Sequence, residues 1–191
     1  MGKIIMSRRS LSILLAIIII GVIAIGFGTS KPQNATKVQL NKAAVINKPL
    51  VLSDFTSIKG QSISLANYRG KRLMVYLVAT WCTSCKASVQ TLLSNATTLQ
   101  KDGLYVVTLK TYGNAGYPGP SIQQFLSSIN STNSLPNNLI FGDASQALTA
   151  SYNPNNTPDI YYLINPSGVV KDINSTPSAT MNTILKFAQG S

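Results

Sequence analysis

The feature that most restricts the fold is an unbroken apolar segment, residues 73–79, that leads within three residues into a Cys-x-x-Cys tetrapeptide. An apolar run of this length without alternation is typical of a strand buried on both faces of a sheet. Hydrophobic residues then recur at helical spacing over residues 89–99, and a second apolar strand is predicted at 104–109. Strand, helix and strand in this order form a βαβ unit, which makes the two strands parallel.

The other predicted elements complete a mixed sheet with helices on both faces. Strands are predicted at 51–58, 62–65, 139–141, 160–164 and 169–173, and helices at 121–129, 145–152 and 181–188. The turn Asn165-Pro166-Ser167-Gly168 joins the last two strands as an antiparallel hairpin. Residues 112–120 are rich in Gly, Pro and Tyr, which predicts a loop.

The N-terminal part of the chain predicts export. Residues 11–27 are apolar and uncharged, and Lys3, Arg8 and Arg9 precede them. This charge bias places residues 1–10 in the cytoplasm and the domain on the extracytoplasmic side. A cleaved signal peptide is the alternative, but a retained transmembrane anchor is favoured because the run exceeds a usual signal-peptide core. Residues 28–48 are then a polar tether and residues 49–191 the domain.

Both cysteines of the chain, Cys82 and Cys85, lie in the tetrapeptide, and there is no histidine. A thiol at a helix N-terminus is stabilised as a thiolate by unpaired N–H groups and the helix dipole. Cys82 is therefore the expected nucleophile, and Cys85, one helical turn on, the resolving thiol. A structural zinc site would need two further ligands of a kind that the chain lacks, so no metal or cofactor is expected.

The charge balance bears on the partners. The 16 Lys and Arg exceed the 5 acids, all of them Asp, but the lysines are scattered singly. A nucleic-acid surface would gather them into a stripe with aromatic residues, so no nucleic acid is expected. Exported protein thiols or disulfides are the predicted partners, and a membrane redox protein is a further candidate.

Five Asn-x-Ser/Thr sequons occur on this exported chain, and together they predict a glycoprotein. They are at Asn34, Asn95, Asn130, Asn155 and Asn174.

Several short segments resemble the ResA/TlpA-like branch of the thioredoxin family. They are Asp54-Phe55, Lys59-Gly60, residues 64–71 and residues 79–85, followed by Tyr152, Thr157-Pro158-Asp159 and residues 162–168. The resemblance implies a thioredoxin-like three-layer α/β/α fold, preceded here by one N-terminal transmembrane helix. It also implies a membrane-anchored or exported thiol–disulfide oxidoreductase, in which Trp81, Thr157 and a cis-Pro158 line the substrate groove beside Cys82 and Cys85.

The sequence departs from the family at three positions where relatives often carry an acid. These positions hold Tyr76, Ser88 and Asn165. No carboxylate is therefore expected near Cys85 to carry its proton. Asp159 is the acid nearest to Pro158 in sequence, but it is expected to face solvent and not to act as the base.

Two other functions remain as alternatives. A redoxin-type thiol peroxidase usually needs Thr or Ser three residues before its reactive cysteine, and this position is Ala79. A non-catalytic thiol- or metal-binding module is disfavoured by the lack of histidine. The redox direction, whether reduction, oxidation or isomerisation, is not determined by the residues Thr83-Ser84 between the cysteines.

Overall fold

The computed structural model describes residues 43–130 and 134–190. All of these residues belong to one compact unit, Thr36–Ser191. The predicted anchor at 11–27, the cytoplasmic segment at 1–10 and the sequon at Asn34 lie outside the described residues. Within residues 43–130 and 134–190, no helix is both long enough and apolar enough to cross a membrane.

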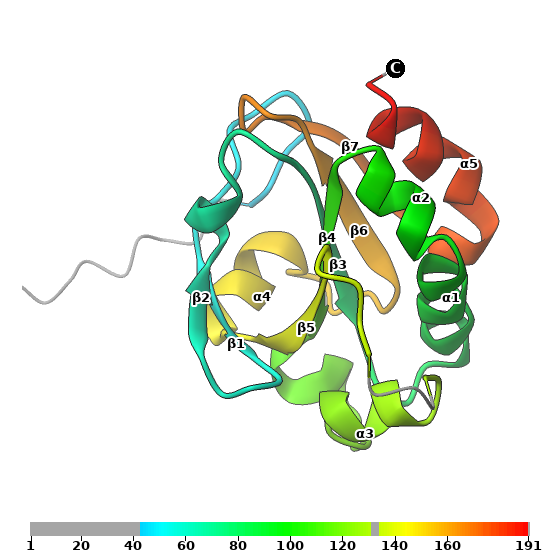
Figure 1. Cartoon of the computed structure of the whole chain (residues 1–191). Coiled ribbons are helices and arrows are strands. Elements are labelled where there is room, and N and C mark those ends of the chain that lie inside the picture. The colour runs from blue at the N-terminus through cyan, green and yellow to red at the C-terminus, as the bar shows by residue number, and fades with distance from the viewer. Residues whose placement is uncertain (1–42, 131–133, 191) are drawn as a thin grey trace, which may run out of the picture. The chain divides into compact units, whose positions relative to one another are not determined.

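The described strands form one mixed sheet in the order β2-β1-β5-β4-β3-β6-β7 (Figure 1). Their bounds are β1 Asp54–Ser57, β2 Ser62–Ser64, β3 Arg72–Val78, β4 Leu104–Lys110, β5 Leu139–Ala144, β6 Ile160–Ile164 and β7 Val170–Ser175. Strands β3, β4 and β5 are parallel, and the other pairs are antiparallel. The predicted βαβ unit and the predicted β6–β7 hairpin are both confirmed.

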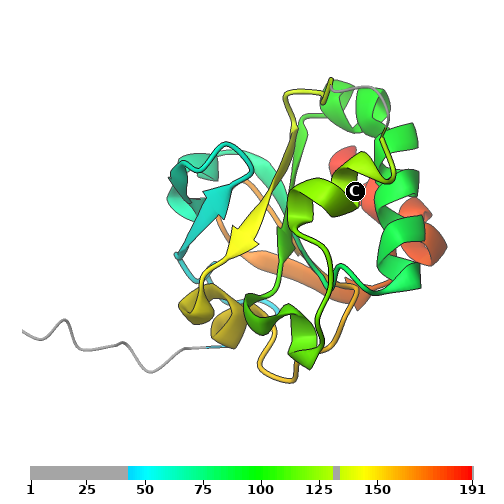
Figure 2. The ribbon, with the colours of Figure 1, turned by 90° about the horizontal axis from the view of Figure 1, so that it is seen from below.

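Helices cover both faces of this sheet, as the sequence predicted. The α-helices are α1 Thr83–Ser94, α2 Ala96–Lys101, α3 Ile122–Ser127, α4 Gln146–Tyr152 and α5 Pro177–Ala188, with 3-10 turns η1 Leu65–Tyr68 and η2 Tyr112–Gly116. Figures 1 and 2 show α1, α2 and α5 on one side of the sheet and α4 on the other. Alternate residues of β3 therefore enter two cores: Tyr76 packs with α1 and α5, and Leu77 packs with α4.

The largest differences from the predicted helices lie at the end of α1 and at the start of α5. The single helix expected after the cysteines breaks at Asn95, where the side-chain amide donates to the Thr91 carbonyl at 2.8 Å. An Asn side chain that bonds the backbone competes with the helical ladder, and this explains the break. Helix α5 begins at Pro177, ahead of the predicted start, because proline is well tolerated in the first helical turn.

Strand β1 closes the sheet against β5 and approaches it closely at Gly142. A Cβ atom at this glycine would lie 2.3 Å from the carbonyl oxygen of Thr56, which belongs to the β1 backbone. The substitution Gly142→Ala should therefore push the strands apart and lower the free energy of unfolding by about 1–3 kcal/mol. Thermal unfolding checks this, with exposed Gln61→Ala as the control. An unchanged midpoint for Gly142→Ala would contradict the close approach.

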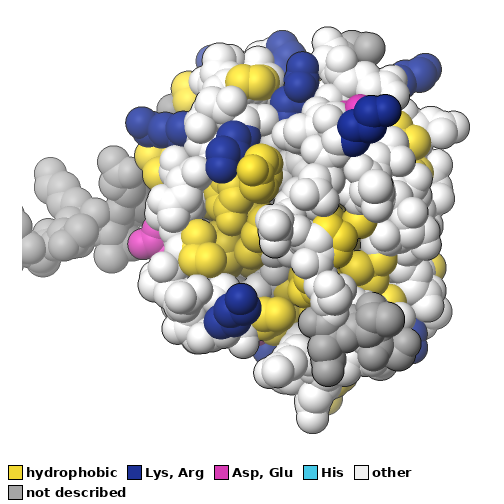
Figure 3. All heavy atoms as spheres, viewed as in Figure 1, with side chains coloured by type: hydrophobic (Ala, Val, Ile, Leu, Met, Phe, Trp, Pro, Cys, Tyr) yellow, Lys and Arg dark blue, Asp and Glu magenta, His cyan; other side chains and the backbone are white. Residues whose placement is uncertain are grey.

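The charged side chains are spread over the surface. Figure 3 shows Lys and Arg at several separate places around one face of the molecule, with hydrophobic side chains between them. The described part of the chain contains one ion pair, between Lys110 and Asp143, with 2.8 Å between Nζ and a carboxylate oxygen.

Candidate functional site

The cysteine pair lies where β3 ends and α1 begins. Cys82 is the N-cap residue of α1, and its Sγ accepts a hydrogen bond from the Cys85 N–H at 3.2 Å. The Ser84 hydroxyl lies 3.1 Å from the same sulfur. A sulfur that caps a helix takes the position where an anion is stabilised by free N–H groups and the dipole. The predicted placement of Cys82 at the helix N-terminus is confirmed.

The two thiols differ in their exposure to solvent. Cys82 keeps 6% of its surface exposed, whereas Cys85 is fully buried, and both are free thiols. Burial raises the pKa of the Cys85 thiol, and its hydrogen bond to Cys82 raises it further. Only Cys82 can meet an incoming substrate, so the geometry fits it as the nucleophile and Cys85 as the inner, protonated partner.

A buried carboxylate lies beside this pair, contrary to the sequence-based prediction. Asp159 is only 3% exposed, and the two sulfurs and a carboxylate oxygen of Asp159 all lie within 4.8 Å of one another. The residue has a φ of +67°, a left-handed conformation that Asp tolerates better than most residues. The turn before β6 thereby directs the side chain inward. The expectation that Asp159 faces solvent was wrong.

Tyr76 holds this carboxylate. Its buried hydroxyl donates a short hydrogen bond to one carboxylate oxygen of Asp159. The other oxygen is buried and has no hydrogen-bond partner among the described residues. Desolvation raises the pKa of the Tyr76 hydroxyl well above its usual range, so the tyrosine remains a donor. Tyr76 occupies the position on β3 where thioredoxins proper carry an acid, and here it binds an acid from the turn before β6.

An aromatic shelf lies next to Cys82. We use this name for Trp81, which is 40% exposed, and Tyr117, which is 65% exposed. The two rings meet edge to face, with 5.2 Å between their centroids. The Trp81 indole N–H donates to the Asn114 carbonyl at 2.8 Å, which fixes the ring. Trp81 is thus exposed beside Cys82, and its contact with a substrate stays a prediction.

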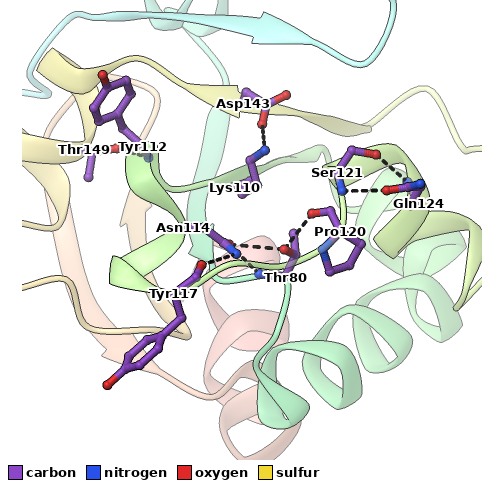
Figure 4. Close-up of polar contacts among 10 residues, drawn as sticks. All are labelled: Thr80, Lys110, Tyr112, Asn114, Tyr117, Pro120, Ser121, Gln124, Asp143 and Thr149. Atoms are coloured by element: carbon purple, nitrogen blue, oxygen red, sulfur yellow. Dashed lines mark hydrogen bonds and ion pairs between the residues drawn. The ribbon is translucent and has the colours of Figure 1, made fainter.

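Asn114 ties the loop after β4 to the segment that leads into the cysteines. Its side-chain oxygen accepts from the Thr80 N–H at 2.8 Å, and its amide donates to the Tyr117 carbonyl at 3.0 Å (Figure 4). The Thr80 hydroxyl in turn donates to the Pro120 carbonyl at 2.8 Å. Residues 113–116 all have positive φ, which Gly and Asn adopt readily. The sequence predicts only a loop over residues 112–120, and its Gly-Asn-Ala-Gly composition is the available signal for this tight turn.

The expected cis peptide bond at Pro158 requires a correction, whereas substrate binding by Thr157 and Pro158 stays a prediction. The described residues contain no cis peptide bond, so the expectation of a cis-Pro158 is not met. The Asn153 side chain accepts from the Thr157 N–H at 2.7 Å and donates to its carbonyl at 2.9 Å. Both backbone groups of Thr157 are thus engaged within the protein, and the turn formed in this way carries Asp159 inward.

The other two positions where relatives often carry acids have structural roles. Ser88 is buried on α1 with its hydroxyl 3.3 Å from that of Ser178. Asn165 accepts from the Val169 N–H at 2.9 Å and closes the β6–β7 turn. Neither supplies a proton acceptor to Cys85, which leaves Asp159 as the nearby carboxylate.

Metal binding would need more donors than this site offers. Cys82, Cys85 and Asp159 are the sole group of three clustered Cys, Asp, Glu or His side chains in residues 43–130 and 134–190. The chain has no histidine and no third cysteine to complete a tetrahedral structural zinc site. The arrangement of two free thiols is better suited to thiol chemistry.

A sequence model of the AhpC/TSA family matches residues 33–173, which is most of the chain. The chain belongs to the AhpC/TSA family. The match includes both cysteines and Asp159 and extends from the N-terminal side of the domain to β7. No functionally curated protein matches the sequence.

Solved structures with thioredoxin-like folds are similar to this domain. The thioredoxin domain of a thiol-disulfide oxidoreductase from Bacteroides vulgatus is 18% identical, with a TM-score of 0.58 over 76% of this chain and 99% of the other. A thioredoxin-family thiol:disulfide interchange protein from Chlorobium tepidum is 19% identical, with a TM-score of 0.57 over 78% and 100%. A secreted disulfide oxidoreductase from Mycobacterium tuberculosis is 18% identical, with a TM-score of 0.54 over 73% and 96%.

These likenesses confirm the predicted thioredoxin-like fold with its mixed sheet. The family match and the neighbours also confirm the predicted resemblance to thioredoxin-like oxidoreductases, and they support the thiol–disulfide oxidoreductase class of enzyme. The identities are low, so the particular substrates of the neighbours are not carried over to this AhpC/TSA-family chain.

Proposed function

We propose that this AhpC/TSA-family protein is a membrane-tethered thiol–disulfide oxidoreductase that acts on exported proteins outside the cytoplasm. The observation that carries the proposal is the unequal cysteine pair at the start of α1. Cys82 caps the helix and keeps 6% of its surface exposed, whereas Cys85 is fully buried. The Cys85 N–H donates a hydrogen bond to the Cys82 sulfur at 3.2 Å. Such a pair can attack a disulfide with one thiol and release the product with the other.

The extracytoplasmic location rests on the sequence. Residues 11–27 are apolar and follow three basic residues, which favours an anchor with the domain outside. A secreted disulfide oxidoreductase among the structural neighbours, the one from Mycobacterium tuberculosis, supports the same side of the membrane. A membrane redox protein would then be one source of electrons, and exported proteins the other partners.

The two free cysteines give a direct test of this location. Intact cells that express the full chain are treated with a membrane-impermeant maleimide, and the protein is then purified and analysed by mass. We expect labelling of Cys82 without permeabilisation, and recovery of the protein in the membrane fraction. A Cys82→Ser variant controls for labelling of Cys85. Labelling that requires permeabilised cells would contradict the proposed location.

Glycosylation is part of the same proposal. Asn155 and Asn174 are exposed, whereas Asn95 and Asn130 are half-buried. The Asn95 amide is also engaged with the Thr91 carbonyl. If the chain is exported through a glycosylating compartment, Asn155 and Asn174 are the sites we expect to be modified.

The aromatic shelf of Trp81 and Tyr117 is the proposed contact surface for protein substrates. Exposed aromatic rings with fixed orientation bind peptide side chains at little entropic cost. Trp81→Ala should lower kcat/KM for a protein disulfide about tenfold, because the substrate loses its contact with the indole ring. A tenfold change corresponds to roughly 1.4 kcal/mol of binding energy. The rate with a small disulfide should change little. Leu52→Ala, at a residue 46% exposed on another part of the surface, is the control. An equal loss for both substrates would contradict a binding role.

A redoxin-type thiol peroxidase, the alternative left open by the sequence, is the second candidate. The structure gives little support for peroxide activation. Ala79 provides only a carbonyl, which accepts from the Cys82 N–H at 3.1 Å, and Arg72 is at the opposite end of β3 from the cysteines. Peroxide consumption in a single turnover by the reduced protein would decide in favour of the peroxidase.

A further inference from the structure

The inference concerns how Cys85 loses its proton, and it rests on the proposed function. Cys85 must become a thiolate before it can attack the mixed disulfide at Cys82. The thiol is fully buried, and burial raises its pKa, so the proton does not leave unaided near neutral pH. The chain has no histidine to take it.

Asp159 is the acid that meets this need by its position. One carboxylate oxygen of Asp159 lies within 4.8 Å of both sulfurs. One of the two oxygens of this carboxylate is buried without a hydrogen-bond partner among the described residues. The other four acids of the chain are outside this cluster: Asp54, Asp102, Asp143 and Asp172.

Within the part of the chain that the structure describes, no Lys or Arg forms an ion pair with the Asp159 carboxylate. The titratable groups that face it are Tyr76 from β3 and the two thiols at the start of α1. On the α5 side, the Asp159 carbonyl accepts from the Thr176 N–H at 2.9 Å, and residues 176–185 carry no charge. The hydrogen bond from Tyr76 occupies one oxygen and leaves the second for proton exchange.

We propose that Asp159 accepts the proton of Cys85 during resolution, and that Tyr76 is the positioning residue that holds its carboxylate at the cysteine pair. Relatives often carry an acid at the positions of Tyr76, Ser88 and Asn165, whereas this carboxylate comes from the turn before β6.

The step balances in atoms and electrons. The Cys82 thiolate attacks one sulfur of a substrate disulfide, forms a bond to it and releases the other sulfur as a thiolate. Cys85 gives its proton to Asp159, and the resulting thiolate attacks the Cys82 sulfur. The Cys82–Cys85 bond forms, the bond from Cys82 to the substrate breaks, and the departing sulfur takes the proton from Asp159. The substrate disulfide is reduced by two electrons and the dithiol is oxidised by two.

The test is a single-turnover experiment with the full reduced chain and a disulfide peptide whose two sulfur fragments carry different fluorophores. Release of the first fragment reports attack by Cys82, and release of the second reports resolution by Cys85. Asp159→Asn should leave the first rate within about twofold and slow the second about a hundredfold near neutral pH, the usual contribution of a positioned acid or base. Asp172→Asn, which removes the same charge elsewhere, should alter neither rate.

The pH profile separates proton transfer from a simple effect of charge. The Asp159 carboxylate itself contributes to the raised pKa of Cys85. If it acted only as a charge, its removal would make Cys85 easier to deprotonate and Asp159→Asn would resolve faster. A base instead predicts slower resolution, which recovers toward the wild-type rate in alkaline solution because hydroxide can then take the proton.

Tyr76→Phe keeps the carboxylate but removes its hydrogen bond. It should slow release of the second fragment less than Asp159→Asn does, leave release of the first unchanged, and recover in alkaline solution, whereas a merely structural tyrosine would alter both rates alike at every pH. This variant also decides the matter if Asp159→Asn fails to fold. Resolution at the wild-type rate and pH profile in either folded variant would overturn the proposal. If the wild-type chain does not release the first fragment, the proposed function fails, and the proposal about Asp159 fails with it.

Discussion

Cys82→Ser should abolish disulfide exchange, with the rate of reduction of a model protein disulfide falling to the uncatalysed level. Serine at this position cannot form a sulfur–sulfur bond with the substrate, and Cys85 is fully buried and cannot replace it. Cys85→Ser should behave differently. It keeps the exposed nucleophile but lacks the thiol that resolves the intermediate, so the mixed disulfide at Cys82 should accumulate.

The measurement is turnover of the protein disulfide in the presence of a dithiol, followed by non-reducing mass analysis of the products. Ser84→Ala is the matched control, because it removes a hydroxyl 3.1 Å from the Cys82 sulfur but leaves both thiols in place. Residual turnover by Cys82→Ser, or covalent adducts that form on Cys85, would contradict the assigned roles.

Leu77→Ala should produce a large loss of stability. Leu77 is fully buried on β3, two residues before Ala79, and packs in the core that α4 covers. Truncation of a buried leucine usually costs about 2–5 kcal/mol because a cavity remains. This is a large part of the roughly 5–15 kcal/mol that stabilises a typical domain. The variant should therefore be close to unfolding.

Denaturant unfolding of the compact unit Thr36–Ser191 measures this effect. Leu52→Ala removes the same atoms from a side chain that is 46% exposed, and it should change the free energy of unfolding by no more than about 0.5 kcal/mol. Similar losses for the two variants would indicate that β3 is not the central buried strand of the sheet.

The arrangement of strands was largely predictable because it depends on hydrophobic patterning. The apolar run at β3 is buried along nearly its whole length, and the β3–β4 pair is parallel as the intervening helix required. The β6–β7 hairpin follows from its turn residues. The antiparallel pairing of β1 with β5 was not predicted, because strand partners far apart in sequence leave no local signal.

The candidate site was predictable where it depends on spacing along the chain. Cys82 and Cys85 lie on one helix, so their relation follows from helix geometry. Asp159 and Asn114 reach the site through contacts with distant residues, Tyr76 and Thr80. Asp159 has a positive φ, and its side chain is buried beside the cysteine pair. The sequence shows which residues could adopt that conformation, but not which of them do.

The central claim is that Cys82 and Cys85 form a reversible two-electron redox pair. The most direct measurement equilibrates the wild-type protein in glutathione buffers of graded potential and determines the oxidised fraction by thiol alkylation and mass. We predict one two-electron transition between free dithiol and the Cys82–Cys85 disulfide, within the range of about −270 to −120 mV spanned by thioredoxin-like proteins. Failure of the intramolecular disulfide to form across that range, or the appearance of glutathione adducts alone, would contradict the account.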